Sequence, residues 1–176
     1  MTTSESLGSA PVPAVGLDDH VRGAGPNAVV YLDLACPRCA GAWARITELP
    51  LAICVRHFPL AGKRPRSAAL HAAVEAAAVQ SEAAFWPFWD SLLFDRGRVD
   101  DPHLWDRASA LGLDVAAFER DRRSDAVAAR VRRDFASGIR GGVTGTPAGF
   151  AGTEQLRGDL VEALEAIAGS GTRPAL

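Results

Sequence analysis

The sequence lacks long apolar runs, and it is poor in cysteine, lysine and methionine. Residues 1–27 have no positively charged start, and prolines and a glycine interrupt their apolar stretch, so no secretory signal peptide is predicted. No segment approaches the roughly 18 unbroken apolar residues of a membrane-spanning helix. These absences predict a cytoplasmic chain that has no membrane partner.

Three cysteines are too few, and odd in number, for the disulfide framework of a small secreted protein. Any disulfide in this chain is therefore expected to be catalytic. Charge is nearly balanced at a formal net value of -2, and Lys63 is the single lysine among 19 basic residues. This balance gives no reason to expect a nucleic acid partner, and the arginine-rich tract 120–140 is interleaved with acids and predicts a solvated helix face.

The 176 residues, 48% of them hydrophobic, suffice for one compact domain. Residues 1–17 carry Ser, Thr, Pro and Gly without periodicity and predict a flexible tail, because such a segment buries too little to offset its ordering entropy. Two β-prone runs at 27–35 and 51–58 flank a helix-length segment at 37–49. This strand–helix–strand order predicts parallel neighbouring strands.

From residue 67 onward the pattern is helical. Pro87 places a helix start near residue 84, and Asp101 before Pro102 predicts a helix N-cap. Aromatic residues at helical spacing are assigned to core packing rather than to a substrate groove: Phe85, Trp86, Phe88, Trp89 and Phe94. The expected helices cover 67–80, 84–94, 102–111, 114–122, 124–140 and 156–169, and a glycine-rich turn with room for a short strand covers 141–152.

The stretch LACPRCAGAW places Cys36 and Cys39 three positions apart, between an expected strand and an expected helix. Pro37 is the expected first helical residue, which leaves Cys36 at the helix N-terminus, where unpaired N–H groups and the helix dipole favour a thiolate. Cys36 is therefore the expected nucleophile. Cys39, one turn further and facing inward, can attack a mixed disulfide on Cys36, so we expect it to be the resolving thiol.

Other interpretations of this pair were weighed against the redox one. A zinc site needs four ligands, but Cys54 and the four histidines supply no second pair at ligand spacing, so no metal is expected. A chance CxxC is the remaining alternative, and the position between a strand and a helix argues against it. Cys54 lies among apolar residues of the second expected strand and is predicted to be a small core residue without a chemical role.

Arg38 lies between the two cysteines. A cation in the first helical turn opposes the dipole at a cost of about 0.3–1 kcal/mol, which a neighbouring thiolate would offset. Its charge would stabilise reduced Cys36, lower the pKa of that thiol and make the disulfide more oxidising. The alternative is that the side chain points into solvent.

Five segments together resemble the DsbA-like thiol-disulfide oxidoreductases, in order across about residues 18–168. A redox pair followed by a helical stretch and then a Gly-Thr-Pro loop is a specific combination. Pro147 follows Cys39 by 108 positions, which is the room that the family's helical insert needs. The segments are DHVRG (19–23), CPRC (36–39), RHFPL (56–60), FWPFWDSLLF (85–94) and GVTGTP (142–147).

The resemblance implies an α/β, thioredoxin-like fold, in which a central mixed sheet flanked by helices is interrupted by a helical insert. The thioredoxin-like part would comprise 18–66 and 141–176, and the insert 67–140. The resemblance also implies a cis Thr146–Pro147 bond beside the cysteine pair. There the backbone of Thr146 could pair with a substrate strand, and Thr146 and Pro147 would bind substrate without doing chemistry.

The sequence departs from the family at two places. Many relatives have a carboxylate six positions before the first cysteine, where it can relay a proton to the inner thiol, but this chain has Val30 there. Resolution by Cys39 is then expected to be slower or to use water, with Asp33 as a substitute acid. After the proline, Gly149 and Gly152 stand in a segment that is usually a bulky apolar strand, and they weaken its strand character.

The sequence thus predicts a thiol-disulfide oxidoreductase that acts on protein or low-molecular-weight thiols through the redox-active Cys36–Cys39 pair, without a bound cofactor. The alternative is a partner-binding or redox-sensing protein of the same fold with little turnover. Neither the direction of net redox flux nor the oligomeric state follows from the sequence.

Overall fold

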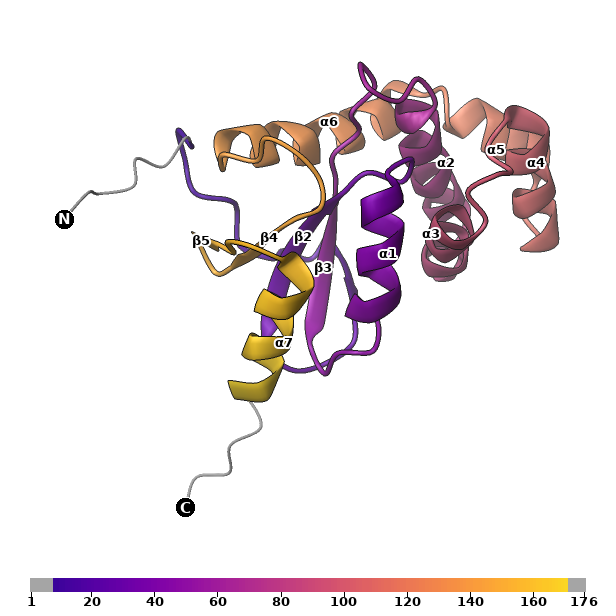
Figure 1. The fold of residues 1–176 in the computed structure, drawn as a ribbon. Helices are drawn as coiled ribbons and strands as arrows, with labels where there is room; N and C mark the ends of the chain where they lie inside the picture. The colour runs from indigo at the N-terminus through magenta and orange to yellow at the C-terminus, as the bar shows by residue number, and fades with distance from the viewer. Residues whose placement is uncertain (1–7, 171–176) are drawn as a thin grey trace.

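The computed structural model describes residues 8–170, which form a five-stranded mixed sheet flanked by helices (Figure 1). The strand order is β1-β3-β2-β4-β5. The central pair β2 and β3 is parallel, as expected, and every other neighbouring pair is antiparallel. The strands are β1 (His20–Arg22), β2 (Asn27–Leu32), β3 (Ala52–His57), β4 (Ala148–Ala151) and β5 (Glu154–Gln155).

The helices divide into two groups (Figure 1). Helices α1 (Pro37–Ile46) and α7 (Leu160–Ser170) lie against each other beside the sheet. Residues 67–140, between β3 and β4, form the helical insert. None of the helices within residues 8–170 is both long and apolar enough to span a membrane. The insert contains α2 (Ser67–Gln80), the 3-10 helix η1 (Glu82–Ala84), α3 (Phe85–Phe94), α4 (Asp101–Ala110), α5 (Val115–Asp121) and α6 (Asp125–Arg140).

Alternation along the strands gives the sheet two apolar faces. Val30 of β2 belongs to the larger core, which also contains apolar residues of α1, α2, α3 and α7. Tyr31 belongs to the smaller core on the other face, where α6 packs against β3. In α6, Gly138 permits this close approach, because a Cβ atom there would lie 2.8 Å from the ring of Phe58.

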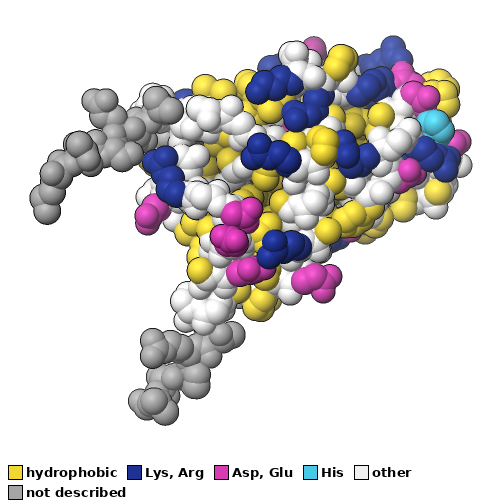
Figure 2. Space-filling view, in the orientation of Figure 1, with side chains coloured by type: hydrophobic (Ala, Val, Ile, Leu, Met, Phe, Trp, Pro, Cys, Tyr) yellow, Lys and Arg dark blue, Asp and Glu magenta, His cyan; other side chains and the backbone are white. Residues whose placement is uncertain are grey.

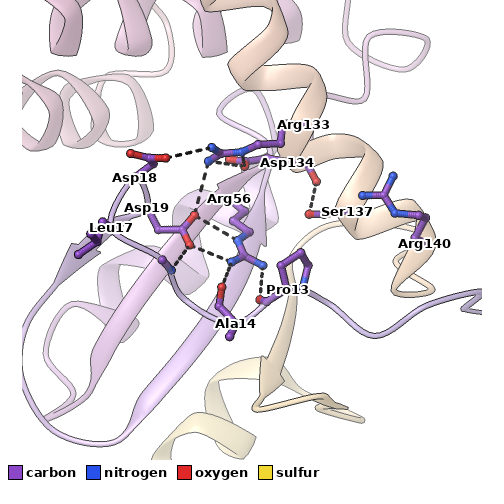
Figure 3. A pocket seen from close by; sticks show the side chains of 11 residues that line it. Pro13, Ala14, Leu17, Asp18, Asp19, Arg56, Arg133, Asp134, Ser137 and Arg140 are labelled. Atoms are coloured by element: carbon purple, nitrogen blue, oxygen red, sulfur yellow. Dashed lines mark hydrogen bonds and ion pairs between the residues drawn. The ribbon is translucent and has the colours of Figure 1, made fainter.

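The N-terminal segment differs from the expected flexible tail. Val12 and Val15 of this segment pack in the smaller core, where Val12 is only 3% exposed. Arg56 of β3 fastens the segment by donating to the carbonyl oxygen of Pro13 at 2.9 Å and to the carboxylate of Asp19 at 2.9 Å (Figure 3). The hydrogen bonds of the buried Arg56 guanidinium thus hold this segment in place, although its sequence lacks the apolar periodicity of a helix or strand. The first seven residues of the expected tail lie outside the described part.

The strand after Pro147 forms in spite of its glycines. Gly149 of β4 pairs with Val30 of β2, and a Cβ atom at Gly149 would lie 2.4 Å from the Leu160 side chain. The glycine therefore leaves room for α7 to pack directly on the strand. The expected weakening is wrong for Gly149, because packing by α7 replaces the missing side chain. Gly152 lies outside the strand, since β4 ends at Ala151 and Gly152 is in the turn that follows.

Three smaller expectations need correction. The N-cap of α4 is Asp100, whose carboxylate accepts from the His103 N–H, and Asp101 is already helical. Phe94 is 58% exposed, unlike the other aromatic residues of its run. The 120–140 tract is not a uniformly solvated face, because the Arg122 side chain is 7% exposed and bridges Glu119 and Asp101.

Candidate thiol-disulfide site

Cys36 is the N-cap residue of α1, and Pro37 is the first helical residue. The Cys36 backbone is extended, with φ -89° and ψ 121°, and its N–H donates to the Asp33 carbonyl at 2.9 Å. Its own carbonyl accepts the first helical bond, from the Ala40 N–H at 3.1 Å. The local sequence therefore places a thiol where the unpaired N–H groups of the helix point.

The Cys36 thiol has a pKa below its usual value. Burial alone would raise this pKa, but the N–H and thiol of Cys39, the Thr146 hydroxyl and the N–H of Arg38 favour the thiolate more strongly. The Cys36 thiol also lies 3.8 Å from the Thr146 carbonyl oxygen, a residue 110 positions away. Cys36 nevertheless has an exposed fraction of 0%.

The pKa of Cys39 is shifted in the opposite direction from that of Cys36. Burial raises its pKa to about 12, and the negative charge of an ionised Cys36 adds to the effect. The Thr146 hydroxyl and the backbone N–H of Asp33 act in the other direction. The Asp33 N–H lies 3.4 Å from Cys39 Sγ, so it is a donor that can stabilise a thiolate there.

The Thr146–Pro147 peptide bond is cis, and it lies beside the cysteine pair. The Thr146 side chain is buried, and its hydroxyl has no conventional hydrogen-bond partner among the described residues. This hydroxyl is therefore free to donate to a sulfur when one ionises. The loop brings a carbonyl and a hydroxyl to the two thiols from the far end of the insert.

Arg38 acts on Cys36 through its backbone N–H, which lowers the pKa of the thiol. Its side chain is exposed and makes no ion pair or hydrogen bond with another residue of 8–170. It lines a pocket of about 290 Å³ together with Pro147 and Arg45. An effect of the guanidinium charge on Cys36 stays a prediction.

Asp33 is fully buried, and each hydrogen bond of its carboxylate is to a group other than the two thiols. It accepts from the Ser67 hydroxyl at 2.6 Å, the Ala35 N–H at 2.9 Å and Arg64 at 3.2 Å. Burial opposes its ionisation, but the nearby His71 ring, the Ser67 hydroxyl and the Ala35 N–H outweigh burial and lower its pKa to about 2. With this pKa the Asp33 carboxyl is ionised at neutral pH and has no proton to donate, so Asp33 is a poor substitute acid.

Val30 and Cys54 lie where the sequence predicts apolar residues. Val30 is fully buried in β2 and supplies no proton acceptor to Cys39. Cys54 is fully buried in β3, on the face of the sheet opposite α1, and burial raises its pKa to about 12.

Sequence reasoning missed a polar cluster beneath the site, formed by His20, His57, His71 and Glu75. From the sequence alone, the histidines are candidates only for zinc ligation. The four-residue spacing of His71 and Glu75 on one helix was a usable signal. No group of three or more His, Cys, Asp or Glu side chains within residues 8–170 is arranged to hold a metal ion.

The surface away from the cysteine pair is mixed in character. An apolar groove of about 670 Å³ lies between α2, α6 and the loop after β3, and Leu60 and Phe135 are among its lining residues. In the view of Figure 2, Lys and Arg side chains are scattered among apolar ones, whereas several Asp and Glu side chains gather near α7.

A cysteine pair at the start of α1, a cis-proline loop beside it and this sheet order define a thioredoxin-like fold of the DsbA type. The chain belongs to the DSBA-like thioredoxin domain family, whose model matches residues 28–167.

Curated relatives are longer proteins. The chain is 36% identical over 149 residues to the Na(+)/H(+) antiporter NhaA of Herminiimonas arsenicoxydans, covering 80% of this chain and 23% of that protein. It is 33% identical over 165 residues to Na(+)/H(+) antiporter NhaA 1 of Mycobacterium sp. (strain KMS), covering 84% and 26%. The chain thus spans about a quarter of the length of these relatives.

Solved structures agree on the fold. The thiol-disulfide exchange protein alpha-DsbA2 of Wolbachia pipientis superposes with a TM-score of 0.76 at 20% identity, covering 88% of this chain and 87% of that one. The catalytic domain of Proteus mirabilis ScsC gives 0.72 at 19% identity, covering 87% and 88%. A thioredoxin-like oxidoreductase from Silicibacter pomeroyi DSS-3 gives 0.74 at 22% identity, covering 99% and 100%.

Proposed function

We propose that this chain is a thiol-disulfide oxidoreductase, with Cys36 as the nucleophile and Cys39 as the resolving thiol. The observation that carries the proposal is the opposite shift of two thiol pKa values within one helical turn, lowered at Cys36 and raised to about 12 at Cys39. Pairs of titratable groups whose environments separate their pKa values mark a division of chemical roles. The redox-active group is this cysteine pair itself.

The exchange proceeds in two substitutions at sulfur. The Cys36 thiolate attacks a substrate disulfide, forms a mixed disulfide and releases one substrate sulfur as a thiolate. The Cys39 thiolate then attacks Cys36 Sγ, the bond to the substrate breaks, and the second substrate sulfur leaves. The substrate gains two electrons and the cysteine pair loses them; oxidation of a dithiol substrate is the reverse sequence.

The expected substrates are proteins or low-molecular-weight thiols. The cis-proline loop supports this expectation, since Thr146 presents backbone groups beside Cys36 that an extended peptide could pair with. A cytoplasmic location stays a prediction. The transport activity in the names of the antiporter relatives belongs to those longer proteins.

The decisive experiment measures insulin reduction with a thiol donor and oxidation of a dithiol peptide. Cys36→Ser should abolish both activities, and Cys39→Ser should accumulate a mixed disulfide with the substrate. Cys54→Ser is the matched control and should keep wild-type rates, because Cys54 lies on the other side of the sheet. Equal activity in wild-type and Cys36→Ser protein would refute the proposal.

Titration of the Cys36–Cys39 couple against glutathione decides the direction of flux. A potential near that of thioredoxin, about -270 mV, would make the protein a reductase, and one near -120 mV would make it an oxidant. The lowered pKa of Cys36 favours the oxidising end, because it stabilises the reduced form.

A second candidate function is redox sensing or partner binding with little turnover. The observation that favours it is the complete burial of Cys36, because a substrate disulfide has to displace part of its cover before reaching the sulfur. Such a protein would form one covalent or tight complex per chain and show negligible multiple turnover. Stoichiometric zinc in the reduced protein, retained by Cys36 and Cys39, would instead overturn both redox interpretations.

A further inference from the structure

A continuous chain of buried hydrogen-bonding side chains runs from the active-site loop to the protein surface. His71 of α2 lies 2.7 Å from His57 of β3, Nδ1 to Nδ1. His57 Nε2 lies 2.5 Å from Glu75 Oε1, and His20 Nε2 lies 3.0 Å from the same oxygen. His20 Nδ1 then contacts Glu82 at 3.0 Å, and the Glu82 side chain is 77% exposed.

The inner end of this chain is a backbone N–H. Leu34, in the loop between β2 and α1, donates its N–H to His71 Nε2 at 3.1 Å. The bond requires that Nε2 of His71 carries no proton, so the proton of a neutral ring is on Nδ1. The Asp33 carboxylate also faces this Nε2, but its Oδ1 lies 3.7 Å away, which is too long for a hydrogen bond, whereas the Leu34 N–H lies within hydrogen-bond distance. That Nδ1–H then donates to His57 Nδ1, and the remaining His57 proton, on Nε2, donates to Glu75.

The carboxylate holds these tautomers in place. Burial opposes the ionisation of Glu75, but hydrogen bonds from His20 and His57 outweigh burial and keep its pKa well below the usual value. An ionised Glu75 only accepts hydrogen bonds, so it fixes the proton of His57 on Nε2. Burial lowers the pKa of His71 to about 4, which agrees with a neutral ring.

The loop that is hydrogen-bonded to His71 also donates an N–H to Cys39. Leu34 directly follows Asp33, whose N–H lies 3.4 Å from Cys39 Sγ. The Asp33 carboxylate is fastened to Ser67 at the start of α2, one turn before His71. Helix α2 therefore holds the Asp33 side chain through Ser67 and the Leu34 N–H through His71, two residues one helical turn apart.

We propose that His71 is a positioning residue for the resolving step: by accepting the Leu34 N–H, it orients the Asp33 N–H toward the Cys39 thiolate, and the chain through His57 to Glu75 keeps its Nε2 an acceptor. This inference rests on the proposed function. The inference assigns no proton transfer to this series of hydrogen-bonded side chains, because the series ends at the Leu34 amide N–H and not at a sulfur.

The test uses an aromatic disulfide, dithiobis-nitrobenzoate, as a substrate that reports each substitution by absorbance. Attack by the Cys36 thiolate releases one thionitrobenzoate and leaves the other bound to Cys36. Attack by Cys39 breaks that bond, forms the Cys36–Cys39 disulfide and releases the second thionitrobenzoate. The first phase therefore reports Cys36, and the second reports Cys39.

His71→Leu should slow the second phase by about tenfold while leaving the first phase within about twofold, since it removes an acceptor for one buried N–H. His71→Gln, whose side-chain oxygen can accept from the Leu34 N–H, should restore most of the rate. Leu104→Ala is the control for general loss of stability, because Leu104 is fully buried in α4, which packs on α3 and α5.

A second phase that is unchanged in His71→Leu, or slowed equally in Leu104→Ala, would overturn the inference. Nitrogen NMR of the wild-type imidazole rings gives a readout independent of turnover: a proton on His71 Nε2 at neutral pH would also overturn it. A wild-type protein that shows no second phase at all would instead refute the proposed function.

Discussion

The two faces of the sheet both bury cysteine, but they give the thiols different chemistry. Cys36 and Cys39 belong to the core on the α1 face, and Cys54 belongs to the core on the opposite face; the exposed fraction of each is 0%. Around Cys36, helix N–H groups together with the Cys39 thiol and the Thr146 hydroxyl overcome the effect of burial and lower the pKa. Around Cys54 burial dominates, and the nearby Asp19 charge raises the pKa further. Position at a helix N-terminus, and not access to solvent, separates the candidate nucleophile from the inert thiol.

The largest expected effect is a difference in alkylation. At pH 7 a thiol with a pKa of about 12 is ionised to about one part in 100,000. Iodoacetamide should therefore label Cys36 roughly a hundredfold faster than Cys54, because the thiolate is the reactive species and the higher nucleophilicity of a high-pKa thiolate offsets only part of the difference in ionisation. Timed labelling of the reduced protein followed by peptide mass spectrometry measures both rates. Comparable labelling of the two residues would remove the distinction between the faces.

Acid should lower the free energy of unfolding through His71. The pKa of His71 is about 4 in the folded chain against 6.5 in the unfolded chain, so as pH falls from 6.5 to 4 the unfolded chain binds a proton that the folded chain refuses. The free energy of unfolding should fall by about 3 kcal/mol across this window. The titratable groups that act on the ring are Asp33, His57 and Asp134.

Urea unfolding at pH 7 and pH 4.5 measures this loss, and His71→Gln should flatten it. Asp33, with a pKa of about 2, adds a second loss only below pH 3.8. An equal pH slope in wild type and His71→Gln would show that the acid sensitivity comes from elsewhere.

A packing change on the Cys54 face should reduce stability without affecting redox chemistry. Gly138→Ala adds a methyl group 2.8 Å from the Phe58 ring, and overpacking of this kind costs about 1–3 kcal/mol. Gly41→Ala in α1 is the matched control, because nothing lies within 4 Å of its added Cβ, and it should stabilise by about 0.5–1 kcal/mol. Denaturant titration gives both values. A changed Cys36–Cys39 potential in Gly138→Ala would contradict the separation of the two faces.

The smallest expected effect concerns Arg38. We expect its guanidinium charge to favour reduced, ionised Cys36, so Arg38→Ala should raise the pKa of the thiol and make the potential more negative, by about 30 mV for each pKa unit. Arg45→Ala, in the last turn of α1 and paired with Glu165, should leave the potential unchanged. Glutathione titration of both variants compares them directly, and an unchanged potential in Arg38→Ala would leave only its backbone N–H in the tuning of Cys36.

Local signals predicted the parts of the site that depend on local structure. Pro37 after Cys36 indicates a helix start, and the thiolate-favouring position follows from that alone. The orientation of Asp33 could not be predicted, because it depends on Ser67, 34 positions away, and on the approach of α2. The role of Gly149 was misjudged for a similar reason, since the side chain that needs its space is Leu160 of another helix.

The contact between Cys36 and Thr146 also has a consequence during synthesis. The two residues are 110 positions apart, so the thiols leave the ribosome long before the loop that covers Cys36 has been made. Until β4 pairs with β2, a nascent chain carries Cys36 and Cys39 without the cis-proline loop beside them. Protection of these thiols is therefore completed late in translation, after the whole helical insert has emerged.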